Sequence, residues 1–184
     1  MEINFVTSNK NKVREFRSIL GENIKLNHIE MAYPELRSDN PQEIAKMSAK
    51  SLAEKLKKAV VVEDSGLFIS ALNGFPGTCS AYIHKRIGLE GILKLMKGVN
   101  DRRCAYKSAV AYCEQGKEPV SFLGSEDGII AREIKGSNGF GHDPIFIPKG
   151  QKKTYGEMKD VEVVKKFRRI AVERLRNYLL ENTQ

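Results

Sequence analysis

The change of pattern along the chain constrains the fold most, because a strand followed by a helix opens it and a β-hairpin comes later. Residues 2–7 (EINFVT) are typical of a short buried strand, and the polar turn SNKNK follows at once. A helix is predicted over residues 11–20, where apolar side chains recur on one side. Residues 105–113 and 119–123 flank the turn EQGKE and predict an antiparallel hairpin. Together these units predict an α/β fold with a mixed sheet flanked by helices.

The other elements are predicted from apolar periodicity and from start and stop signals. Asn40, Pro41 and Glu43 have the spacing of a helix cap, a first helical residue and a capping partner. The remaining predictions are strands at 24–29, 60–64, 128–134 and 145–147, with breaks at Gly124 and Gly128, and helices at 89–97 and 161–180.

Length and composition predict one domain over residues 1–184, because 41% of the residues are hydrophobic and no linker divides the chain. No apolar run of membrane-spanning length and no leader pattern occurs, so we expect a cytoplasmic protein that does not bind a membrane. The three cysteines, Cys79, Cys104 and Cys113, lack metal-site spacing and predict neither a disulfide framework nor a zinc site.

The net charge of +8 indicates an anionic partner. Nucleic acid, a phosphorylated small molecule or a membrane surface would each satisfy it. No RGG, RNP-like or zinc-finger pattern is present, and charge alone does not choose among these partners.

The segment TSNKNK joins the first strand to the first helix. Unpaired backbone N–H groups at a helix start favour phosphate, and Thr7, Ser8, Asn9 and Lys12 add hydroxyl, amide and ammonium groups. The alternative interpretation is an ordinary capped helix with solvated lysines.

Glu63 and Asp64 follow three valines, and this places carboxylates at the predicted end of a buried strand. Carboxylates there suit Mg²⁺, or one of them could orient or deprotonate a water. Neighbours on a strand point to opposite faces, so we expect only one to enter a site. A turn-forming Asp-Ser-Gly is the alternative. Glu35, in the loop YPELR, is a further acidic candidate.

The loop KGSNGFGHDPIF carries an aromatic residue, Phe140, between Gly139 and Gly141. The glycines let a flat ligand approach the backbone, so Phe140 could stack on a base, and His142 and Asp143 could donate or accept hydrogen bonds. Alternatively Phe140 fills the core and His142 is an ordinary surface histidine.

Several of these motifs occur together and in order: TSNxxK, PEL, VEDSGL, GFPG, and GFGHDPIF followed by EM. In this combination the chain resembles the inosine/xanthosine triphosphate pyrophosphatases, in an archaeal-like form. The resemblance implies hydrolysis of deaminated purine nucleoside triphosphates (ITP, XTP and their deoxy forms) to the monophosphate and pyrophosphate. It also implies an elongated mixed sheet with two lobes and a central cleft, Mg²⁺ (or Mn²⁺) as cofactor, and a homodimer.

The resemblance also implies roles for individual residues. The residues matched to triphosphate binding are Thr7, Ser8, Asn9, Lys12 and Lys50. Those matched to the metal and the water are Glu35 and Asp64, with Glu63 in support. Those matched to the base are Phe140, Gly141, His142, Asp143, Lys165 and Arg168. Asp64 is the expected catalytic residue.

The chain departs from the family just before the last helix. The family carries Ser-His-Arg there, whereas this chain has Lys166, Phe167 and Arg168, with Lys165 near the family's upstream lysine. His142 replaces the family's usual Tyr or Trp. Phenylalanine cannot donate a hydrogen bond to a purine oxygen, so two alternatives stay open. One is a broader nucleotide pyrophosphatase, and the other is a non-catalytic protein of the same fold that binds nucleotides or nucleic acid; the intact phosphate and metal motifs disfavour the second.

Overall fold

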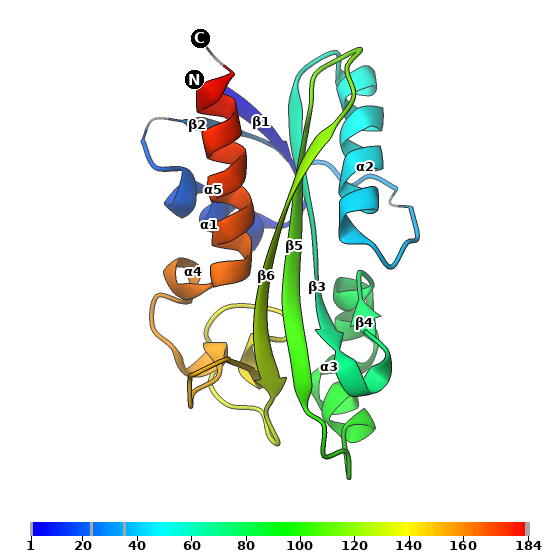
Figure 1. The fold of residues 1–184 in the computed structure, drawn as a ribbon, viewed down its shortest axis with the longest axis vertical. Coiled ribbons are helices and arrows are strands. Elements are labelled where there is room, and N and C mark those ends of the chain that lie inside the picture. The colour runs from blue at the N-terminus through cyan, green and yellow to red at the C-terminus, as the bar shows by residue number, and fades with distance from the viewer. Residues whose placement is uncertain (1, 23, 35, 183–184) are drawn as a thin grey trace. The chain divides into compact units, whose positions relative to one another are not determined.

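The computed structural model describes residues 2–22, 24–34 and 36–182 of the chain. Within them, seven strands form one mixed sheet in the order β2-β1-β3-β5-β6-β7, with β4 paired to β3. Strand β1 runs parallel to β2 and β3, whereas β4 and β7 run antiparallel to β3 and β6. Helices flank the sheet (Figure 1), which confirms the predicted α/β fold. The elements are β1 (Glu2–Val6), α1 (Lys10–Leu20), β2 (Lys25–Ile29), α2 (Pro41–Leu56), β3 (Val60–Ile69), β4 (Pro76–Gly77), α3 (Ser80–Leu95), β5 (Arg103–Cys113), β6 (Val120–Ile130), β7 (Phe146–Pro148), α4 (Val161–Val164) and α5 (Lys166–Glu181).

The chain forms two compact units, which are described separately. Unit 1 combines the described residues of 1–64, 108–124 and 166–184, and unit 2 combines 65–107 and 125–165. The single domain over residues 1–184 stays a prediction. Among the helices of the described residues, none has the length and apolar character needed to span a membrane.

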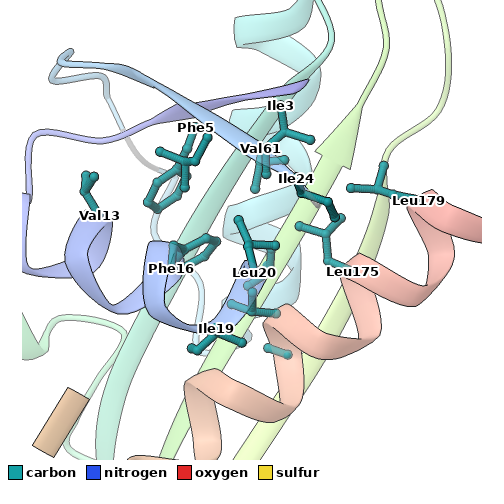
Figure 2. Packing of buried hydrophobic residues seen from close by; sticks show 14 residues of the cluster. Ile3, Phe5, Val13, Phe16, Ile19, Leu20, Ile24, Val61, Leu175 and Leu179 are labelled. Atoms are coloured by element: carbon teal, nitrogen blue, oxygen red, sulfur yellow. The ribbon is translucent and has the colours of Figure 1, made fainter. Parts of the chain in front are cut away.

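In unit 1, helices α1 and α5 pack against each other and against one face of the strands. Figure 2 shows their side chains meeting those of β1 and β3 in one apolar cluster. Phe5 of β1 stacks on Phe16 of α1, with ring centroids 4.0 Å apart and planes 15° apart. Val61 of β3 and Leu175 and Leu179 of α5 complete the contact. Burial of each large side chain contributes about 1.5–3 kcal/mol, so this cluster fixes α1 and α5 on the strands.

Helix α2 covers the other face of the same strands. It begins as predicted, with Pro41 in its first turn and the Asn40 side chain accepting a backbone hydrogen bond at 2.9 Å. Val60 and Val62 of β3 belong to the apolar cluster under α2, whereas Val61 belongs to the cluster under α1 and α5. The alternation of side chains along β3 therefore assigns successive residues to opposite faces.

Strand β3 does not end at Glu63–Asp64, as the sequence predicted, but continues to Ile69. The Ser-Gly that resembled a turn lies inside the strand. A Cβ on Gly66 would lie 1.9 Å from the carbonyl oxygen of Gly77 in β4. Glycine is therefore needed here for close approach of two backbones, and the two carboxylates lie in the middle of a rigid strand.

The predicted break in β6 at Gly124 and Gly128 is also wrong, since one strand runs through both. A Cβ on Gly124 would lie 1.9 Å from the carbonyl oxygen of Phe167, and one on Gly128 would lie 2.5 Å from that of Ile147. Both glycines make room for a neighbouring segment, α5 in unit 1 and β7 in unit 2.

Two helix predictions need correction. Helix α3 begins at Ser80 and is kinked at Gly88, which has φ +64° and ψ −167°. The predicted helix over 89–97 matches the part after the kink, whereas the part before it was not predicted, because only Ser80 is buried there and no apolar stripe results. The predicted helix over 161–180 is two helices, α4 and α5, separated at Lys165 with φ −63° and ψ 108°. The Lys165 side chain is buried and pairs with Asp143 in unit 2, which holds the backbone outside the helix.

Candidate active site

The first turn of α1 gathers residues that the sequence predicts to hold a triphosphate. Asn9 caps the helix, with its Oδ1 accepting hydrogen bonds from the backbone N–H groups of Asn11 at 3.0 Å and Lys12 at 3.4 Å. Thr7 Oγ1 accepts one from the Asn9 backbone at 3.1 Å, and Ser8 is exposed. The positive end of the α1 dipole lies here, where an anion is favoured.

Glu63 and Asp64 lie on opposite faces of β3, because they are consecutive residues of an extended strand. Glu63 shares the face of Val61, under α1 and α5, and Asp64 shares that of Val62, under α2. Both carboxylates are buried. The two carboxylates therefore lie in different environments, one on each face of β3.

Donors surround the Glu63 carboxylate. Its Oε1 accepts hydrogen bonds from Ser108 Oγ at 2.6 Å and Arg168 Nε at 2.9 Å, and its Oε2 lies 2.9 Å from Lys12 Nζ. Burial by itself raises the pKa of Glu63, but Arg168, Lys12 and Ser108 outweigh it and lower the pKa to about 2. Glu63 is therefore ionised at neutral pH, and this pKa does not suit a general base.

Arg168, which the resemblance assigns to the base, is buried in unit 1 with 2% exposure. Its Nη1 binds Glu15 and its Nε binds Glu63. Burial alone would lower the pKa of Arg168, but the two carboxylates raise it above its ordinary value. The sequence did not predict Glu15, because its burial beside the apolar stripe of α1 cannot be read from spacing. Buried glutamates almost always have a partner, so burial would have been the useful signal.

In unit 2, Asp143 organises the residues predicted to contact a base. Its Oδ2 accepts a hydrogen bond from the backbone N–H of Phe140 and lies near Lys165 Nζ, each at 2.7 Å. The hydroxyl of Tyr106, another residue that the sequence did not predict, lies 3.4 Å from Asp143 Oδ1. A Cβ on Gly139 would lie 2.1 Å from Asp143 Oδ2, so only glycine fits there. The Asp143 carboxylate thus fixes the loop that presents the aromatic ring.

The Phe140 ring lies 4.1 Å from Lys165 Nζ, measured to the ring centroid, and is half-buried. Gly141 follows it with φ +62°. The contact between the ammonium and the ring fixes the orientation of Phe140.

His142 is 3% exposed, and its Nε2 has no hydrogen-bond partner within the described residues. The His84 ring lies edge-on to it, with 5.2 Å between centroids. Burial, with a smaller contribution from His84, lowers the pKa of His142 to about 4. The interpretation as a surface histidine is therefore wrong. At neutral pH the buried ring is uncharged and can donate or accept one hydrogen bond.

Of the two remaining predicted residues, one is not described and the other is not joined to these groups. Glu35 lies outside the described residues. Lys50 is exposed on α2, and its ammonium binds Glu118, which raises the pKa of Lys50. In the part of the chain that the structure describes, no group of three or more His, Cys, Asp or Glu side chains could hold a metal ion. The metal and triphosphate roles of these residues stay predictions.

Phe167 is 2% exposed and belongs to the core, and its ring lies 5.0 Å from the Arg168 guanidinium carbon. It therefore shields the buried charges at the start of α5.

Unit 2 also has a cavity of about 670 Å³ whose walls include Phe68, Lys107 and Lys149, and none of the predicted site residues lines it.

The chain is similar to proteins of one kind along almost all of its length. A family model described as the Ham1 family matches residues 3–178. A dITP/XTP pyrophosphatase of Methanopyrus kandleri is 46% identical over 184 residues, which are 99% of this chain and 98% of that protein. One from Thermococcus kodakarensis is 42% identical over 99% of both chains. Among solved structures, the Ham1 protein of Staphylococcus aureus has a TM-score of 0.83 at 27% identity, covering 98% of this chain and 100% of that chain.

Proposed function

Because the chain belongs to the Ham1 family, we propose that it hydrolyses deaminated purine nucleoside triphosphates, ITP, XTP and their deoxy forms, to the monophosphate and pyrophosphate. One observation carries the proposal. Lys12, in the first turn of α1, binds Glu63 of β3, which brings a helix N-terminus beside the strand that carries Asp64. Such a pairing supports charge neutralisation and alignment of a water, which phosphoryl transfer requires.

Mg²⁺ is the cofactor we propose, with Mn²⁺ as an alternative. Asp64 supplies a buried carboxylate on a rigid strand, and this donor chemistry fits a hard divalent cation. Glu35 would be its second ligand. When bound, the ion neutralises phosphate charge and acts as a Lewis acid.

In the proposed reaction a water attacks the α-phosphorus. The new bond joins the water oxygen to that phosphorus, and the bond to the bridging oxygen breaks, so pyrophosphate leaves with the electron pair. Asp64 orients the water and accepts its proton, because the low pKa of Glu63 disfavours that role. Lys12, Thr7, Ser8, Asn9 and the N-terminus of α1 stabilise the charge on the phosphates.

For the base, we propose stacking on Phe140 and hydrogen bonds from the loop of unit 2. The neutral His142 ring supplies one polar partner, and Lys165 and Asp143 hold the platform. A broader base choice is the second candidate, because the buried Phe167 cannot donate to a purine oxygen. A homodimer, implied by the family resemblance, and a cytoplasmic location, expected from the sequence, are part of the proposal.

Asp64→Asn tests the catalytic assignment. We expect the turnover of ITP to fall by roughly 10²–10⁴-fold, the range for loss of a positioned acid–base group, with the thermal unfolding temperature nearly unchanged. Chromatography of the products identifies the cleaved bond: inosine monophosphate and pyrophosphate support the proposal. Inosine diphosphate and orthophosphate would contradict it, and a full-rate variant would remove Asp64 from the chemistry.

A further inference from the structure

Four charged side chains of unit 1 form a continuous row of alternating sign: Glu15, Arg168, Glu63 and Lys12. Arg168 joins the two carboxylates, with its Nε 2.9 Å from Glu63 Oε1, and Lys12 Nζ lies 2.9 Å from Glu63 Oε2. The side chains of the first three are at most 2% exposed, whereas that of Lys12 is 17% exposed. The row therefore reaches solvent at Lys12.

Lys12 is held twice by one residue. Its Nζ lies 2.9 Å from the Glu63 carboxylate and also donates a hydrogen bond to the backbone carbonyl oxygen of Glu63 at 2.9 Å. A free lysine side chain has many rotamers, and fixing it before a ligand arrives removes that entropic cost from binding. Lys12 itself lies in the first turn of α1, where its backbone N–H binds the Asn9 cap.

The remaining contacts of Glu63 oppose a role as metal ligand. Ser108 and Arg168 bind Oε1, and Lys12 faces Oε2, so a metal ion would have to displace a partner from a buried site. Displacement would leave a buried cation without its carboxylate, which is strongly unfavourable. Asp64 lies on the other face of β3 and is not a member of the row.

We propose that Glu63 and Arg168 are positioning residues that act through Lys12, and that neither binds the metal or the base. Arg168 fixes Glu63, Glu63 fixes the Lys12 ammonium, and Lys12 binds the leaving pyrophosphate. Glu15 and Ser108 hold Arg168 and Glu63 in turn. This inference rests on the proposed function and assigns its residues differently from the family resemblance.

Binding of inorganic pyrophosphate and of Mn²⁺, each measured by calorimetry without nucleotide, tests the inference. Glu63→Gln keeps the shape of the side chain but removes its charge. We expect pyrophosphate affinity to fall roughly 10- to 100-fold, the range for a charge-assisted hydrogen bond, and the KM for ITP to rise with it while kcat changes less. Mn²⁺ affinity should stay within about twofold, whereas Asp64→Asn should abolish it.

A double-variant cycle separates positioning from direct binding. If Glu63 acts through Lys12, then Lys12→Met with Glu63→Gln binds pyrophosphate no more weakly than Lys12→Met alone. If the losses of pyrophosphate affinity in the two single variants multiply in the double variant, the inference is overturned. Loss of Mn²⁺ binding in Glu63→Gln would also overturn it. Ser108→Ala, which removes one hydrogen bond from Glu63, is the milder variant if Glu63→Gln does not fold, and a loss of about threefold is expected.

Lys25→Met is the matched control, because Lys25 is an exposed lysine paired with a glutamate, Glu2, at 3.2 Å. It removes the same charge from the protein without touching the row, and pyrophosphate affinity should stay within about twofold. Failure of the unaltered protein to release pyrophosphate from any triphosphate would overturn the proposed function itself. An active protein with multiplied losses would overturn the positioning role alone.

Discussion

The buried charges of the two units differ in how they are paired with one another. In unit 1, Arg168 and Lys12 together with Ser108 surround Glu63, and Glu15 occupies the other side of Arg168. In unit 2, the Asp143–Lys165 pair lies beside a half-buried ring, Phe140, and His142 has an Nε2 without a partner in the described residues. A cluster of charges paired with one another holds its members in place, whereas a buried ring nitrogen without a hydrogen-bond partner gains from a ligand. We therefore propose that the first cluster positions Lys12 and that the second recognises the base.

Removal of the central cation should separate the two clusters most strongly. Arg168→Met removes a cation that two buried carboxylates share, whereas Lys165→Met removes a cation that contacts one. We expect Arg168→Met to lower the free energy of unfolding by about 3–5 kcal/mol and Lys165→Met to lower it less. Urea unfolding monitored by circular dichroism measures both. Equal losses, or a loss below about 1 kcal/mol for Arg168→Met, would break the comparison.

Each cluster should make the stability of the protein depend on pH in a different pH range. The pKa of His142 is lowered from 6.5 to about 4, so the unfolded chain binds more protons and stability falls as the pH drops from 6.5 through 4. The pKa of Glu63 is lowered from 4.5 to about 2, so its contribution is complete above 4.5 and is lost as the pH drops through 2. Each shift corresponds to about 3 kcal/mol.

Unfolding by urea at a series of pH values tests this order. His142→Gln should flatten the stability curve between pH 6.5 and 4 and leave the fall below 4.5 unchanged. A variant curve that matches the parent in the upper window would show that His142 is not buried and neutral.

The preference for ITP over ATP should change only with substitutions in unit 2. His142→Phe removes the unsatisfied polar group, and we expect the ratio of kcat/KM for ITP over ATP to fall about tenfold, the value of one hydrogen bond to the base. Lys12→Met should lower kcat/KM for both nucleotides and leave their ratio within about twofold, because phosphate is common to both. Steady-state kinetics on the two substrates measures this ratio, and a change of ratio in Lys12→Met would erase the distinction.

Local patterns predicted much of unit 1, because its strands and helices carry regular apolar spacing. The cap at Asn40 and the first strand–helix pair appear in the structure. Of the apolar stripe predicted for the last helix, Phe167, Ala171 and Leu175 are buried, whereas Val164 is exposed. The errors came at glycines. Gly66 and Gly124 read as turns or breaks, yet each permits contact with a distant backbone that local sequence does not reveal.

The candidate site was predicted only in part. The loop around Phe140 and the first turn of α1 carry recognisable motifs, so their residues were identified from the chain alone. Glu15, which binds Arg168, was missed because the two residues come from opposite ends of the chain and only tertiary packing joins them. The break at Lys165 was missed for the same reason, since burial against Asp143 overrides its place in a helical pattern.

Pyrophosphate release from ITP, XTP and ATP, with Mg²⁺ and with chelator, tests the central claim most directly. We predict metal-dependent release that is faster from ITP and XTP than from ATP, with the monophosphate as the other product. Equal release from all three would keep the chemistry but contradict recognition of a deaminated base by unit 2. Absence of release from all three, by protein shown to be folded, would contradict the proposed enzyme.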